Sequence, residues 1–82
     1  MLTDYIHKAM HRAHYEILED DDSYYGEIPG FQGVWANAPT LEACRDDLKD
    51  ALEGWVLLGL QLGHTLPVVE DIDLNFNKQE AA

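Results

Sequence analysis

The amino-acid sequence predicts a two-layer α+β domain with an antiparallel sheet and the element order helix, three strands, helix, strand. Two stretches carry apolar residues at helical spacing, and three short segments between them have the composition of strands. The links between these segments are shorter than the crossover of about a dozen residues that parallel strands require. We therefore expect one domain over residues 1–82, with an N-terminal helix in 1–14, a core in 15–76 and a polar tail in 77–82.

The first predicted element is an amphipathic helix from Thr3 to about Ala13. Its apolar residues recur every three or four positions, and Thr3 is the candidate N-cap. Asp4 near the start and Arg12 near the end have the charges that the helix dipole favours.

Three strands are expected next, over Tyr15–Glu19, Tyr24–Ile28 and Val34–Ala38. The first two flank a polar hairpin loop that contains Asp20, Asp21 and Asp22. Side-chain alternation places aromatic and acidic residues together on the face away from the second helix: Leu18, Tyr25 and Trp35 beside Glu16, Glu27 and Asn37. Such a face either recognises a cationic protein or is covered by the first helix.

A turn connects the second and third strands through Pro29, Gly30 and Gly33. Proline presets one backbone angle and the glycines can adopt positive φ, so that Phe31 can be tucked under the turn. After the third strand, Pro39 disfavours helix and Thr40 can cap the amides that follow.

The second helix is predicted over Leu41–Leu62, with Gly63 as its left-handed C-terminal residue. Its expected core stripe comprises Leu41, Cys44, Leu48, Ala51, Leu52, Trp55, Gly59 and Leu62. Val56, Leu57 and Leu60 add further apolar surface, which either the chain's own tail or a second subunit must cover. The small core and this surface predict a homo-oligomer. A fourth strand is expected at Ile72–Phe76, where polar and apolar residues alternate.

The sequence resembles the HicB family of antitoxins from toxin–antitoxin systems. The resemblance extends from Tyr15 to Pro67 and depends on two motifs: Tyr24-Tyr25-Gly26-Glu27-Ile28-Pro29-Gly30-Phe31-Gln32-Gly33, and Pro39-Thr40-Leu41-Glu42-Ala43 at the helix start. The chain departs from the family pattern at Val34, Ala38 and Cys44.

Net charge restricts the classes of partner. The formal charge of −11 and the pI near 4.3 repel phosphate backbones and favour a basic protein partner, so we expect no binding to nucleic acid. A double-stranded-RNA-binding domain has a similar order of elements, but its second helix is basic, whereas this one opens with Glu42, Asp46 and Asp47. The single cysteine, the absence of a signal peptide and the short apolar runs predict a cytoplasmic protein without a membrane segment.

Histidines His7, His11 and His14 are spaced to share one helix face, and histidines four residues apart can ligate a transition metal. The alternative interpretation, which we prefer, is a solvated polar face without a metal or other cofactor. No nucleophile elbow or phosphate-binding glycine loop is present, and Cys44 falls within the buried stripe, so we do not expect an enzyme.

The resemblance implies an antitoxin that neutralises a small basic ribonuclease, a HicA-type toxin, by binding it directly. The expected partner-binding residues are Glu16, Asp20, Asp21, Asp22, Tyr25, Glu27 and Trp35, and the expected oligomer interface comprises Val56, Leu57 and Leu60. The chain ends too soon after its fourth strand for the DNA-binding module that many family members carry. The main alternative is an oligomeric protein-binding module without a toxin, and a weaker one is a metal-binding protein that uses the helical histidines.

Overall fold

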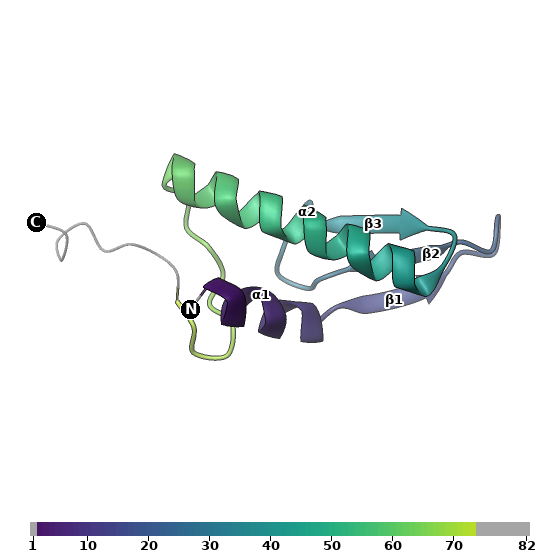
Figure 1. The fold of residues 1–82 in the computed structure, drawn as a ribbon, viewed down its shortest axis with the longest axis horizontal. Helices are drawn as coiled ribbons and strands as arrows, with labels where there is room; N and C mark the ends of the chain where they lie inside the picture. The colour runs from purple at the N-terminus through teal and green to yellow at the C-terminus, as the bar shows by residue number, and fades with distance from the viewer. Residues whose placement is uncertain (1, 74–82) are drawn as a thin grey trace, which may run out of the picture.

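The computed structural model describes residues 2–73 and confirms the α+β class and the antiparallel sheet. The elements are α1 (Leu2–His11), β1 (His14–Ile17), β2 (Tyr24–Glu27), β3 (Trp35–Ala38) and α2 (Leu41–Leu62). Figure 1 shows α2 running along the sheet, with α1 beside it and beyond the start of β1. Most of the predicted fourth strand, residues 74–76, and the predicted tail lie outside the described residues; before them, Val69 and Ile72 form an isolated antiparallel bridge.

The sheet has the order β1-β2-β3, and Gly26 lies at its centre, paired with Tyr15 on one side and Ala36 on the other. These three residues face α2, as the alternation predicted. Gly26 is required here because a Cβ atom at this position would lie 2.9 Å from the Tyr15 ring and 3.2 Å from the Cys44 sulfur. The absence of a side chain at Gly26 therefore allows the Tyr15 ring and α2 to pack closely on the sheet.

The limits of α2 are those that the sequence predicts. The Thr40 hydroxyl accepts a hydrogen bond from the Ala43 amide at 3.1 Å, and Gly63 ends the helix with a φ of 72°. The buried positions of α2 are Cys44, Leu48, Leu52, Val56 and Gly59. The predicted core stripe was wrong at both ends, because Leu41 and Leu62 are exposed, and the expected interface residue Val56 is fully buried in the protein's own core.

The segment after α2 folds back over part of the helix. Leu66 is buried against Gly59, and a Cβ atom added to Gly59 would lie 2.7 Å from Cδ2 of Leu66. The Tyr5 hydroxyl donates a hydrogen bond to the Pro67 carbonyl at 2.6 Å, which joins α1 to this segment. The chain itself thus covers one side of the apolar half of α2, as one of the two alternatives predicted.

The first helix ends earlier than the periodicity predicted. Its regular hydrogen bonds end at His11, and the amides of Arg12 and Ala13 bond to carbonyls three residues back, at 3.0 and 3.1 Å. Thr3 lies inside α1 and does not cap it, and His14 belongs to β1. No helix among residues 2–73 combines the length and the apolar composition needed to cross a membrane.

Candidate partner-binding face

The side of the sheet that faces away from α2 carries four of the seven predicted partner-binding residues. The register places Glu16, Tyr25 and Asn37 side by side across the three strands, and His14, Glu27 and Trp35 in the next row. We call these six residues the outer face. Because α1 packs beside α2, neither helix covers it, and the alternative in which α1 folds over this face was wrong.

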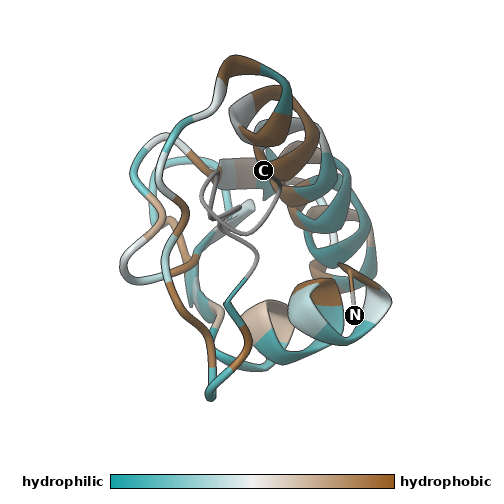
Figure 2. Ribbon diagram, turned by 90° about the vertical axis from the view of Figure 1, so that its left-hand side faces the viewer, coloured by the Kyte–Doolittle hydropathy of each residue, from teal (hydrophilic) through white to brown (hydrophobic). Residues whose placement is uncertain are grey.

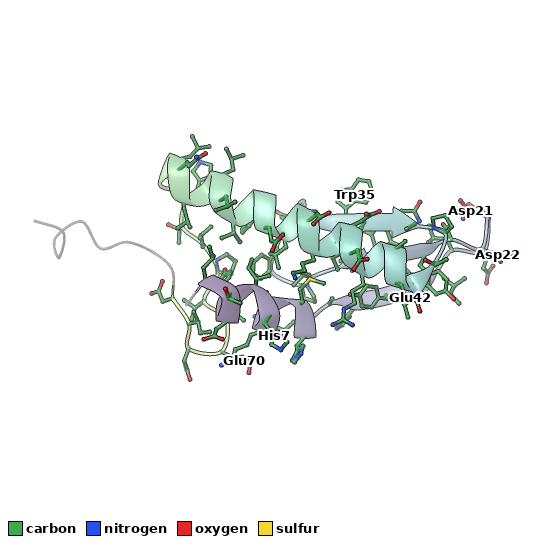
Figure 3. All side chains as sticks on the ribbon, in the orientation of Figure 1. His7, Asp21, Asp22, Trp35, Glu42 and Glu70 are labelled. Atoms are coloured by element: carbon green, nitrogen blue, oxygen red, sulfur yellow. The ribbon has the colours of Figure 1, made fainter. Side chains whose placement is uncertain are left out.

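An aromatic pair lies at the centre of the outer face. The rings of Tyr25 and Trp35 stack with centroids 6.2 Å apart and an interplanar angle of 23°. Trp35 is 56% exposed, and Figure 3 shows it projecting away from β3. A large aromatic side chain exposed to this degree on a sheet contributes little to the core of its own protein and offers rigid contact area to a partner.

Carboxylates border this aromatic pair. The Tyr25 hydroxyl donates a long hydrogen bond, 3.4 Å, to an oxygen of Glu27, and Glu16 is the direct cross-strand neighbour of Tyr25. Partial desolvation, followed by the charge and hydrogen bond of Glu27 and the charge of Glu16, raises the pKa of Tyr25 above its ordinary value of 10.0. Tyr25 therefore remains protonated and can donate a hydrogen bond at neutral pH.

Two hollows flank Tyr25 and Glu27. One, of about 250 Å³, is also lined by His14, Tyr15 and Glu16. The other, of about 540 Å³, extends from Tyr25 and Glu27 along residues 28–35, including Trp35. Each hollow combines an aromatic ring with at least one carboxylate, and this combination suits the long cationic side chain of an arginine or lysine.

The turn between β2 and β3 fixes the position of Trp35. Gly30 and Gly33 both have a φ of 88°, and the Val34 amide bonds to the Phe31 carbonyl at 3.2 Å. Phe31 is buried beneath the turn, with its ring centroid 5.3 Å from that of Trp55 in α2. The predicted anchoring of this turn is confirmed, and it holds the start of β3 on the core of the protein.

The acidic hairpin loop lies at the far end of the same sheet. Its residues Asp20, Asp21 and Asp22 are exposed, and Figure 3 shows Asp21 and Asp22 at the tip of the molecule. The Asp21 carboxylate accepts hydrogen bonds from the Ser23 hydroxyl at 2.6 Å and from its amide at 3.1 Å. These bonds hold the pKa of Asp21 below its ordinary value of 3.8.

Charge is segregated within the sequence and the fold. No lysine or arginine occurs between Arg12 and Arg45, the span that forms the whole sheet, its hairpin loop and its turn. The cations of residues 2–73 lie on α1, directly after it, or on α2: Lys8, Arg12, Arg45 and Lys49. The outer face is therefore acidic without a neutralising cation of its own sheet, and its field attracts a basic partner.

The structure brings Glu16, Tyr25, Glu27 and Trp35 together, and it places the three loop aspartates apart from them, at the tip. His14 lies opposite Glu27 in the sheet, but it was not among the residues predicted to bind a partner. The signal was available, since His14 has the same parity as Glu16 and alternation carries both to one face.

The three histidines do not form one cluster. His7 and His11 lie on α1 with ring centroids 4.5 Å apart, whereas His14 lies in β1 on the sheet. Within residues 2–73, no three His, Cys, Asp or Glu side chains gather as metal ligands. The metal-binding alternative therefore loses the third ligand on which it depended.

The fold and this face define a small α+β domain with one open, acidic and aromatic sheet face. The chain belongs to the UPF0150-like family, whose profile matches residues 4–67. Among solved structures it is similar to TTHA0281 from Thermus thermophilus, with 40% sequence identity, a TM-score of 0.83, and coverage of 93% of this chain and 94% of that one. A comparison with curated proteins gives no significant match.

Proposed function

We propose that this protein is a HicB-like antitoxin that neutralises a small basic ribonuclease of the HicA type by binding it through the outer face. The observation that supports the proposal most strongly is the exposed Tyr25–Trp35 stack bordered by Glu16 and Glu27. The proposal also rests on the two motifs that resemble HicB, the first of which forms β2 and the turn before β3, and the second the start of α2.

The chemistry of the outer face selects a cationic protein. An arginine side chain can stack its guanidinium plane on Trp35 or Tyr25 while it pairs with Glu27 or Glu16 in the adjoining hollow. The hairpin aspartates contribute to long-range attraction, which raises the rate of association more than the final affinity. Neutralisation then follows from covering the toxin's surface and requires no catalytic group of this protein.

The direct test is co-expression with a small basic protein encoded beside this one, followed by pull-down and an assay of RNA cleavage. We expect the two proteins to copurify and the cleavage to stop. Trp35→Ala is expected to weaken binding about 30-fold, the equivalent of about 2 kcal/mol for a central aromatic anchor. Val68→Ala is the matched control, because Val68 is 53% exposed but lies outside the sheet.

Charge reversal in the hairpin loop distinguishes long-range attraction of the partner from direct contact with it. Replacing Asp20, Asp21 and Asp22 by lysine should reduce the association rate and its dependence on salt. The same change in net charge at Asp46, Asp47 and Asp50 is the control, since these exposed residues lie on α2 and not on the sheet. Equal effects of the two triple variants would show that only net charge matters and would remove the hairpin from the binding surface.

Failure of the neighbouring protein to bind, or cleavage that continues in the presence of excess wild-type protein, would refute the antitoxin function. The outer face would then belong to a protein-binding module without a toxin. Salt-sensitive micromolar binding to duplex DNA or RNA in fluorescence anisotropy would contradict the expectation, drawn from the charge of −11, that the protein does not bind nucleic acid.

A further inference from the structure

The exposed side of the C-terminal half of α2 is apolar except for Gln61. Leu57, Leu58 and Leu62 are 52%, 55% and 58% exposed, on the side of the helix turned away from the buried Val56. Figure 2 shows that hydrophobic residues predominate in these last helical turns. Among residues 64–73, the described part of the segment after α2, the chain covers the side that carries Gly59 and leaves these leucines exposed.

Gly54 lies on this same exposed side, one turn before Leu57 and Leu58. A glycine inside a helix is destabilising relative to alanine, so its presence needs a reason. Gly26 and Gly59 are each required by a neighbouring side chain, but a Cβ added to Gly54 would meet no atom within 4 Å. Nothing among the described residues requires glycine at this position, which leaves room for the close approach of another chain.

A hollow of about 280 Å³ adjoins these residues, lined by Leu2, Ile6, Glu53 and Leu57. It lies between α1 and α2, and its lining is apolar except for Glu53. A protruding leucine of another chain can enter it, and a two-fold arrangement repeats the contact in both directions.

The distribution of charge allows the occupant to be a second copy of this chain. Two molecules of charge −11 repel each other over most of their surfaces. Between Glu53 and Glu70, however, the sequence contains no Asp, Glu, Lys or Arg. Figure 1 shows this end of α2 at the opposite end of the long axis from the acidic hairpin loop, so two copies meeting here keep their acidic tips far apart.

We propose that Gly54, Leu57, Leu58 and Leu62 form a two-fold interface in which α2 packs antiparallel on α2 of a second copy. A crossing centred on Leu58 sets Leu62 of one helix over Gly54 of the other, because these residues lie four positions on either side of the centre. Gly54 presents no side chain at that point, and the helices approach closely. The interface includes the predicted residue Leu57 and excludes the predicted residues Val56, which is buried, and Leu60, which packs partly buried against the core. It does not depend on the proposed toxin.

Sedimentation velocity on the full chain, from low micromolar to several hundred micromolar, tests this interface. Wild-type protein should sediment as a dimer. Leu58→Asp should weaken the dimer by about 100-fold or more, since a two-fold interface contains each substitution twice. Ile17→Asp is the matched control, because Ile17 is 58% exposed but lies on the sheet, and it should leave the dimer intact.

Gly54→Lys distinguishes loss of the dimer from loss of the fold, which Leu58→Asp alone does not. Lysine is a better helix former than glycine and meets no neighbour within this chain, so the monomer should unfold at an equal or higher temperature while the dimer dissociates. A wild-type protein that stays monomeric at several hundred micromolar overturns the proposal. A dimer unchanged by both Gly54→Lys and Leu58→Asp overturns it as well.

Discussion

Replacing Gly26 by alanine tests the closest packing in the protein. The new Cβ would lie 2.9 Å from two ring atoms of Tyr15 and 3.2 Å from the sulfur of Cys44, whereas ordinary contacts of this kind measure 3.4–4 Å. Gly26 is on the central strand, so neither the sheet below nor α2 above can move away freely. The ring of Tyr15 must shift or the helix must lift.

Two opposing effects set the size of the change. Overfilling a packed core costs about 1–3 kcal/mol, and replacing a glycine in the interior of a strand by alanine recovers about 0.5–1 kcal/mol. We therefore expect Gly26→Ala to lower the free energy of unfolding by about 1–2 kcal/mol. Urea denaturation followed by circular dichroism measures this change, with an unchanged slope confirming that both proteins unfold in the same way.

The Tyr15→Ala background supplies the control. With the ring removed, only the Cys44 contact at 3.2 Å remains, and Gly26→Ala should become close to neutral. The double-mutant cycle should therefore give a coupling of about 1–2 kcal/mol between the two positions. If Gly26→Ala is as stable as wild type, or if it costs the same in both backgrounds, the packing argument is wrong.

Three further predictions concern single contacts. Tyr5→Phe removes the hydrogen bond to the Pro67 carbonyl and should lower the free energy of unfolding by about 1–2 kcal/mol, measured by urea denaturation. Thr40→Ala removes the N-cap of α2 and should lower the free energy of unfolding by about 1 kcal/mol in the same assay, whereas Thr40→Ser should retain most of this stabilisation. Because hydrogen bonds from Ser23 lower the pKa of Asp21, the stabilisation they give is fully present above the ordinary pKa of 3.8 and is lost as the pH falls through the lowered value. Asp21→Asn should accordingly flatten the decline of stability in that acid range, and an unchanged pH profile would contradict this assignment.

Local chemistry made α2 and the turn before β3 predictable. The limits of α2 follow from Thr40 and Gly63, whose roles depend only on adjacent backbone atoms. The turn follows from Gly30 and Gly33, and the strand alternation then assigns Trp35 to the outer face. Features that depend on a few neighbouring residues can therefore be predicted from the sequence. They include the positions of Glu16, Tyr25, Glu27 and Trp35 on the outer face.

Features decided by distant contacts were not predictable in the same way. Val56 was wrongly assigned to an interface. The buried positions of α2 continue from Leu52 to Val56, on the side of the helix that the following segment covers, and local periodicity does not show this. The return of Leu66 over Gly59 depends on tertiary packing. The end of α1 was also missed, since helical spacing continues through His14 although that residue pairs with β2.

The short strands of the sheet have a consequence for how the protein should be handled. Within residues 2–73, β1 and β3 each have one long edge without a strand partner, and such edges can template edge-to-edge association between molecules. Each strand is only four residues long, Pro39 follows β3 directly, and the acidic hairpin adds repulsion next to β1. This electrostatic protection vanishes near the pI of about 4.3 and is screened by salt, so mildly alkaline buffers of low ionic strength should keep concentrated samples free of aggregates.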